Sequence, residues 1–270
     1  MLRTLAVSMF LFLSAGADAQ GVIIHKKYGA PIKVPFAELD SISTYDYEDE
    51  TPIENGHEYV DLGLPSGTLW ATCNVGAENP EDYGDYFAWG ETEPYYTEGN
   101  AQSTASDIWK TGKSAGYTWS SYKWCNGSTT TMAKYCTSSS YGTVDNKTVL
   151  DPEDDAAHVQ WGGNWRMPTY DELNELKTQC TWTWTQLNGV NGYKVSSKQQ
   201  GNTNSLFLPA AGCRSGSSLC NVGSSGHYWP SSLDTSNSRY AYLVDFGSRY
   251  VNWYYDYRYS GRSVRPVCTE

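Results

Sequence analysis

Short apolar stretches separated by turn residues run along most of the chain. In residues 21–47, Val22-Ile23-Ile24-His25 and Ile32-Lys33-Val34 flank Tyr28-Gly29-Ala30-Pro31, a pattern that predicts strand, turn and strand. From Tyr59 onward, short apolar pieces alternate with Gly, Pro, Asn and Ser. We therefore predict a small β-rich N-terminal unit followed by a larger domain of short strands.

One helix has a complete start signal. Thr169 is an N-cap residue, and Glu172 follows it by three positions, which together form the capping-box pattern. Leu173, Leu176 and Cys180 then recur at spacings of three and four, so they share one face of a helix. The sequence predicts that this helix begins after Thr169 and packs through that face.

The remaining pattern predicts an α+β fold. Residues 97–148 are rich in Ser, Thr and Tyr without a sustained period, so we predict a long irregular insertion there. Short strands are expected after the helix at 181–185, 193–196, 205–208, 241–246 and 263–268. One or two helices among many short strands define the α+β class.

The N-terminus has the features of an export signal. Residues 1–19 combine Arg3, an apolar stretch from Leu5 to Leu13, and the small-residue cleavage site Ala17-Asp18-Ala19. The alternative is a buried N-terminal helix. We predict a cleaved signal peptide at 1–19 without a lipid anchor, and hence a secreted or cell-surface bacterial protein.

Domain boundaries follow from composition. We predict a small β-rich unit at 20–47, an acidic solvated linker at 48–56 and the main domain at 57–270. Outside the N-terminus no apolar run is long enough to span a bilayer, so no transmembrane segment is expected.

Composition narrows the partners. The chain has a net charge of −11, which argues against nucleic acid because phosphate binding needs clustered Lys and Arg. Its aromatic content of 14% is high, and 22 Tyr with 11 Trp can build a core, so a disordered chain is not expected. Seven cysteines without a C-x-x-C motif argue against a zinc ribbon. Cys125–Cys136 and Cys180–Cys268 are conceivable disulfides, although spacing alone does not assign pairs.

The C-terminal segment has the composition of a binding surface. Residues 240–259 hold seven Tyr, one Trp, two Arg and two Asp, and stiff amphipathic Tyr and Trp side chains are typical of antibody paratopes. Val244, Phe246, Val251 and Trp253 are predicted to point inward. The predicted ligand-binding residues are Tyr240, Tyr242, Asp245, Arg249, Tyr250, Asn252, Tyr254, Tyr255, Asp256, Tyr257 and Tyr259.

Two alternatives remain open for this segment. Its aromatic residues could be cross-strand pairs of an ordinary sheet. Residues 201–269 carry six Arg and three Asp, so this part differs in charge from the acidic scaffold, which suits an extracellular protein or glycan partner. A solvated face without a partner would give the same count.

Several stretches resemble a known family. Residues 60–71 (VDLGLPSGTLWA), 161–172, 206–212 (LFLPAAG), Tyr228-Trp229 and 263–267 (SVRPV) are similar in order to the Fibrobacter succinogenes major paralogous domain, over about residues 57–269. The resemblance implies a C-type-lectin-like fold related to the formylglycine-generating and sulfatase-modifying group, export, and a surface role.

The C-terminal segment also resembles the variable regions of proteins diversified by retroelements. In those systems adenines are randomised, mostly in Asn codons, which can yield Tyr, Asp, Ser, Gly, Arg, His, Cys or Leu but never Lys, Glu, Gln, Met or Trp. Residues 201–269 contain no Lys, Glu, Gln, Met or Ile, and seven of their Tyr lie at 240–259. Selection for a tyrosine-rich binding loop would leave the same composition.

Sequence motifs for catalysis or metal binding are weak. His25, His57, His158 and His227 are scattered, and Gly112–Gly116 matches the nucleophile-elbow string only in a Ser- and Gly-rich context. The acidic clusters at 78–82 and 151–155 lack EF-hand spacing and are read as solvated turns, with calcium as the alternative.

The sequence therefore predicts a non-enzymatic ligand-binding protein, a surface adhesin or receptor, with no catalytic residues, metal or cofactor. One alternative is an exported enzyme of the formylglycine-generating type or a hydrolase, with Cys213 and Cys220 over a pocket. The other is a structural pilus or matrix component assembled through the N-terminal unit.

Overall fold

The structure is a computed structural model that describes residues 21–24, 32–35, 51–94 and 116–269. The chain divides into two units, Met1–Asp49 and Glu50–Glu270. In the first unit, β1 (Gly21–Ile24) pairs antiparallel with β2 (Ile32–Pro35), which confirms the two predicted strands. The signal peptide predicted at 1–19 and the turn at 28–31 lie outside the described residues.

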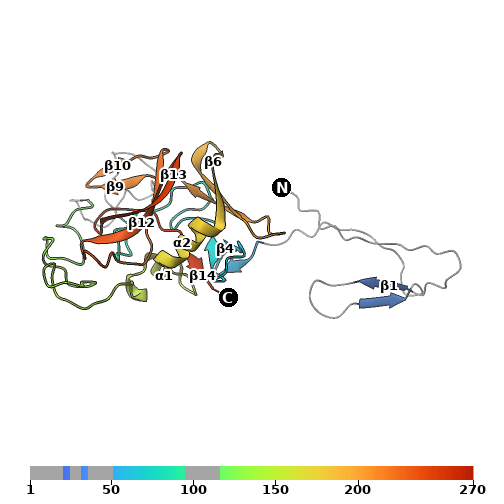
Figure 1. The fold of residues 1–270 in the computed structure, drawn as a ribbon, viewed down its shortest axis with the longest axis horizontal. Helices are drawn as coiled ribbons and strands as arrows, with labels where there is room; N and C mark the ends of the chain where they lie inside the picture. Colours follow the sequence, from blue (N-terminus) through green and yellow to red (C-terminus); the bar gives the residue numbers. More distant parts are fainter. Residues whose placement is uncertain (1–20, 25–31, 36–50, 95–115, 270) are drawn as a thin grey trace. The chain divides into compact units, whose positions relative to one another are not determined.

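The second unit is β-rich with two α-helices in its described part, so the α+β class is confirmed (Figure 1). Its elements are β3 (Ile53–Glu54), β4 (His57–Val60), β5 (Leu69–Ala71), the 3-10 helix η2 (Pro152–Asp154), α1 (Ala156–Trp161), α2 (Tyr170–Gln179), β6 (Cys180–Leu187), β7 (Val190–Ser197), β8 (Ser205–Pro209), β9 (Cys213–Ser215), β10 (Ser218–Cys220), β11 (Ser225–Tyr228), β12 (Tyr240–Gly247), β13 (Tyr250–Tyr257) and β14 (Val267–Cys268).

All strand pairs in this unit are antiparallel. The sheets have the orders β14-β5-β4-β3, β6-β7-β8, β11-β12-β13 and β9-β10. In the first of them, the C-terminal strand β14 pairs with β5, near the start of the domain. The two ends of the domain are therefore joined in one sheet.

Asn-Gly pairs close two of the hairpins. Asn55 and Gly56 between β3 and β4 both have positive φ, at 44° and 84°, and Asn188 and Gly189 between β6 and β7 repeat this at 48° and 85°. Two consecutive positive φ angles define the type I′ turn, whose twist matches that of paired strands. The domain thus begins with a hairpin at Ile53, earlier than the expected boundary at residue 57.

Helix α2 follows its sequence signal. Thr169 accepts a hydrogen bond from the Glu172 backbone N–H, and the Glu172 carboxylate accepts one from the Thr169 N–H at 2.8 Å, so the capping box is complete. Leu173 and Leu176 are buried, as the three- and four-residue spacing predicts. These side chains pack into a core cluster with Val244 and other apolar residues.

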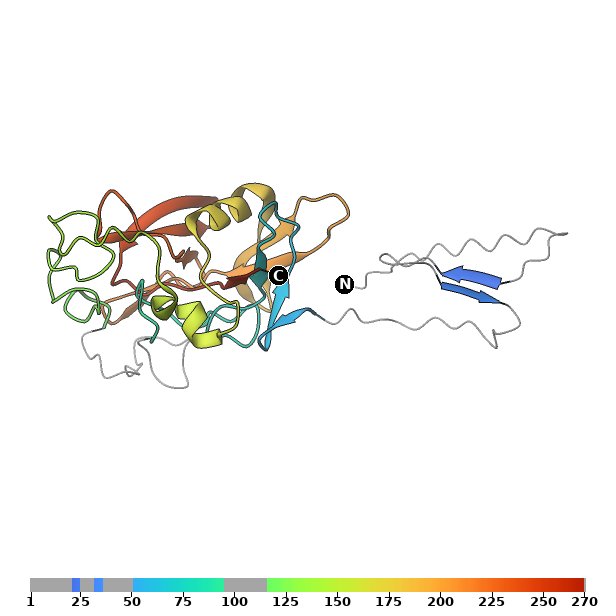
Figure 2. The same cartoon turned by 90° about the horizontal axis from the view of Figure 1, so that it is seen from below.

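Two core clusters lie on opposite faces of the sheet β11-β12-β13. Ala241 and Leu243 of β12 pack in a cluster with Trp89, whereas Val244 and Phe246 pack in another with Leu176. Successive side chains of a strand point to opposite faces, so the central strand β12 is covered on both sides. β13 lies at the edge of this sheet, and Figure 2 shows the hairpin of β12 and β13 along the surface of the domain.

The described part of the insertion, residues 116–148, contains no helix or strand, as predicted. It nevertheless packs into a core cluster that it shares with Tyr86 and Ala211, in which Tyr117, Tyr122 and Met132 are almost fully buried. Irregular backbone is therefore held by side-chain packing here.

Two sequence predictions are wrong. A strand was expected over 263–268, but only Val267–Cys268 form one, because Ser263 makes a single bridge to Tyr228 and residues 264–266 pair with no strand. The disulfides Cys125–Cys136 and Cys180–Cys268 are absent: all seven cysteines are free. The Cys125 and Cys136 thiols donate to different carbonyls, and Cys180 and Cys268 belong to different core clusters.

None of the helices within the described ranges is long and apolar enough to cross a membrane.

Candidate functional site

The tyrosine-rich segment forms the hairpin of β12 and β13. Tyr240 lies opposite Tyr257 and Tyr242 opposite Tyr255, while Val244 lies opposite Trp253. Directly opposed residues share a face of the sheet. The tyrosines of one face therefore form two neighbouring pairs, and the apolar residues continue that row toward the turn.

The predicted binding residues differ in exposure. Tyr250, Tyr254 and Tyr255 expose 41%, 58% and 49% of their surface, and they are the most exposed aromatic residues in the described part of the chain. Arg249 and Asn252 are also exposed. The others are half-buried, namely Tyr240, Tyr242, Asp245, Asp256, Tyr257 and Tyr259.

The prediction that four apolar residues of the hairpin point into the core is confirmed for the two on the central strand β12. Val244 and Phe246 are buried at 1% and 0% exposure. Val251 and Trp253, on the edge strand, are only half-buried against the same cluster. The difference arises because β12 has a neighbouring strand on each side and β13 has one on a single side only.

Ring contacts connect these side chains into a continuous series, which we call the aromatic strip. It passes around the edge strand β13, because Tyr254 lies opposite Leu243 on one face of the sheet and Tyr255 lies opposite Tyr242 on the other. Tyr240 stacks on Tyr257 at 4.9 Å between ring centroids, Tyr257 stacks on Tyr259 at 5.4 Å, and Tyr254 is parallel to Tyr255 at 5.3 Å. The strip consists of Trp119, Tyr170, Tyr240, Tyr242, Trp253, Tyr254, Tyr255, Tyr257 and Tyr259.

Two members of the strip were missed by sequence reasoning. Tyr170, the first residue of α2, stacks on Trp253 at 4.0 Å, and Trp119 of the insertion meets Tyr259 edge-on at 4.9 Å. Their positions depend on tertiary packing, and no local pattern reveals them. The aromatic share of 97–148 is about that of the whole chain, so composition gave no signal either.

A buried arginine anchors the end of β13. Arg258 is fully buried, and its guanidinium donates to the carbonyls of Tyr135 and Ser238 at 3.0 and 2.9 Å and to the Tyr122 hydroxyl at 2.8 Å. Its planar fork can satisfy several acceptors at once. Arg258 therefore ties the insertion to the hairpin that carries the strip.

The positive charge expected from the arginine count of residues 201–269 is mostly not on the surface. Of the six arginines in 201–269, four are buried at 5% exposure or less, namely Arg214, Arg258, Arg262 and Arg265. Arg265, for example, donates to the backbone carbonyls of Ala71, Thr72 and Phe207. Only Arg239 and Arg249 reach the surface. The buried arginines therefore form hydrogen bonds inside the domain and contribute little charge to the strip.

The two predicted aspartates also face inward partners. Asp256 forms an ion pair with the buried Arg262. Asp245 lies 3.3 Å from Nδ1 of His227, and burial raises the pKa of the Asp245 carboxyl. Burial, with the nearby Arg262 charge, lowers the pKa of His227 to about 3, so this imidazole is neutral near pH 7. Both carboxylates thus hold the hairpin in place.

The acidic cluster at 151–155 forms ion pairs with two lysines. Lys134 Nζ lies 2.6 Å from both Asp151 and Asp154, and Lys123 Nζ lies 3.1 Å from Asp154. Although burial opposes it, hydrogen bonds from Lys134, Tyr135 and Lys123 lower the pKa of Asp154. Asp151, Glu153 and Asp154 lie close enough to hold an ion, but these ammonium groups already compensate their charge.

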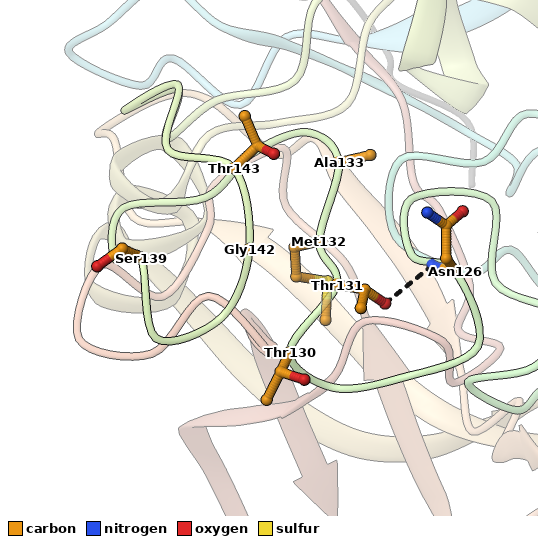
Figure 3. Close-up of a pocket in the computed structure, with 8 residues that line it drawn as sticks. All are labelled: Asn126, Thr130, Thr131, Met132, Ala133, Ser139, Gly142 and Thr143. Carbon is orange, nitrogen blue, oxygen red and sulfur yellow. Dashed lines mark hydrogen bonds between the residues drawn. The ribbon is translucent and has the colours of Figure 1, made fainter.

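A polar hollow of about 380 Å³ lies in the insertion (Figure 3). Its lining contains no His, Cys or carboxylate, and comprises Asn126, Thr130, Thr131, Met132, Ala133, Ser139, Gly142 and Thr143. Thr131 Oγ1 accepts a hydrogen bond from the Asn126 N–H at 3.1 Å. The hollow therefore offers hydroxyl and amide groups without an acid–base pair.

The cysteines named in the enzyme hypothesis lie elsewhere. Cys213 and Cys220 are opposed residues of the β9–β10 hairpin, and neither lines the hollow. Burial raises the pKa of the Cys213 thiol, which disfavours the reactive thiolate. His57 stacks on Trp161 at 3.7 Å, and the Gly112–Gly116 string lies mostly outside the described residues.

No protein-family model, curated protein or solved structure gives a significant match to the chain.

Proposed function

We propose that the protein is an exported ligand-binding protein, a surface adhesin or receptor, that recognises a protein or glycan through the aromatic strip. One observation carries this proposal: Tyr254 and Tyr255, the most exposed members of the strip, stack on each other on β13 and face water. Soluble domains rarely leave large aromatic side chains clustered in water, and such clusters mark interaction sites.

The supporting scaffold is stiff. Phe246 and Leu243 fix β12 between two core clusters, and Arg258 holds the end of β13. Tyr side chains lose little rotamer entropy on binding, and a rigid support reduces that cost further. The arrangement suits recognition by a preformed surface.

The family assignment belongs to the same proposal. We propose a C-type-lectin-like domain of the Fibrobacter succinogenes major paralogous type, with a cleaved signal peptide at 1–19 and variation of residues 201–269 by a retroelement. The order of the resembling segments and the absence of Lys, Glu, Gln and Met from 201–269 support it. A near-repeat of the coding segment that differs at adenines, beside a reverse transcriptase gene, would test the variation.

Binding is tested with two probes, a glycan array and phage-displayed random linear peptides. The variant is the double substitution Tyr254→Ala and Tyr255→Ala, and the control is Val159→Ala with Val222→Ala, two exposed apolar residues away from the strip. We expect the control to retain binding to whichever probe the wild type selects, and the tyrosine variant to lose it. If both variants bind as well as the wild type, the strip is not the recognition surface.

A further inference from the structure

β13 leaves one side of its backbone unpaired. It forms the edge of the sheet β11-β12-β13, and its only strand partner in the described chain is β12. The Arg258 N–H donates to the Arg239 carbonyl, so even-numbered residues of this strand direct their backbone groups toward β12. The odd-numbered residues Val251, Trp253 and Tyr255 therefore direct theirs away from the sheet.

These outward groups have no partner among the described residues. At the end of the strand, by contrast, the Tyr257 N–H donates to the Asp256 side chain at 2.6 Å, and the Tyr257 carbonyl accepts from Ser260 at 2.9 Å. The open edge thus spans Val251 to Tyr255, with an N–H and a C=O at each of Val251, Trp253 and Tyr255.

The usual protections of an edge strand are missing from β13. Residues 250–257 contain no Lys or Pro, and the charge of Asp256 is compensated by Arg262. A long edge strand without such protection is a template for pairing with another strand. β6, an edge strand of the same length, exposes Thr181 and Thr183, whereas β13 exposes aromatic rings.

We infer that β13 binds an extended segment of a partner polypeptide as an added strand. The outward groups of Val251, Trp253 and Tyr255 would pair with the segment, and its side chains would pack on the aromatic strip. The inference rests on the proposed function and narrows the partner to a weakly charged polypeptide, because the only charged side chain of residues 250–257, Asp256, is already paired with Arg262. A glycan would use the rings and leave these backbone groups unpaired.

Proline substitution distinguishes the contribution of the Tyr255 backbone N–H to binding from that of the Tyr255 ring. Tyr255→Ala and Tyr255→Pro both remove the ring, but only proline removes the outward N–H, at the kind of edge position where proline is tolerated. Gln186→Ala and Gln186→Pro form the matched control, since Gln186 is an exposed outward position of β6. The probe is a linear peptide selected on the wild type from the phage library.

We expect Tyr255→Pro to bind this peptide at least about tenfold more weakly than Tyr255→Ala. The two Gln186 variants should bind equally. Hydrogen exchange on the wild type provides a second readout: the peptide should slow exchange at the Val251, Trp253 and Tyr255 amides.

Three results would overturn the inference. The first is equal binding by the two Tyr255 variants with unprotected outward amides. The second is glycan-array binding that depends on Tyr254 and Tyr255 but leaves those amides unprotected; it would sustain the proposed function and refute strand addition. The third is protection of the outward amides by self-association without peptide, which would assign the edge to a second copy.

Discussion

Replacing Tyr254 and Tyr255 by alanine should separate binding from folding. A tyrosine side chain has about 200 Å² of surface, so exposures of 58% and 49% leave about 115 and 100 Å² in water. At about 25 cal/mol per Å², complete burial by a ligand would contribute about 5 kcal/mol. Because association costs cancel part of this, we expect a loss of about 2–4 kcal/mol, or about 30- to 1000-fold in Kd.

The same exposures predict a small effect on stability. The double variant loses the parallel stacking of the two rings and the preference of tyrosine for strands, together less than about 2 kcal/mol. Urea unfolding followed by tryptophan fluorescence gives this value. Phe246→Ala is the control within the hairpin: Phe246 is fully buried, so we expect a loss of about 3–5 kcal/mol.

A fall in unfolding free energy of more than about 4 kcal/mol for the tyrosine double variant would refute the reasoning, because losses of that size come from buried rings. The rings would then belong to the core, as the ordinary-sheet alternative holds. A small loss with unchanged Kd would refute only the binding role.

Three further predictions concern the scaffold. Arg258→Met should cost about 3 kcal/mol or more in urea unfolding, because three backbone carbonyls and a buried hydroxyl lose their donor; an unchanged midpoint would contradict the anchoring role. Burial opposes ionisation of Glu172, but hydrogen bonds from Arg166 and Thr169 lower its pKa to about 2, so stability should fall as the pH drops from 4.5 toward 2, and less so in Glu172→Gln; parallel pH profiles would refute this. A thiol reagent should label Cys73 and Cys220 in the native protein and the five buried cysteines only after denaturation, which mass spectrometry checks.

Local signals predicted the elements that depend on neighbouring residues. The capping box at Thr169 and Glu172 placed the start of α2, and alternation placed β12. The Asn55-Gly56 turn was an equally local signal, and it was missed because the surrounding acidic residues suggested a linker.

The features that the sequence did not predict depend on contacts between residues far apart in the chain. Alternation suggested one covered face for β12, yet both of its faces are buried because the strand is central. Four of the C-terminal arginines are buried, and three of them, Arg258, Arg262 and Arg265, donate to backbone carbonyls, which no count of charges reveals. Tyr170 and Trp119 join the strip only because α2 and the insertion fold against the hairpin.

The central claim is that the rings of β13 face water, and hydroxyl-radical footprinting with residue-level mass spectrometry tests it most directly. The account predicts rapid oxidation of Tyr250, Tyr254 and Tyr255 in the native protein, and protection of the buried Tyr86, Tyr117 and Tyr228. Oxidation of the three β13 tyrosines as slow as that of the buried three would contradict it.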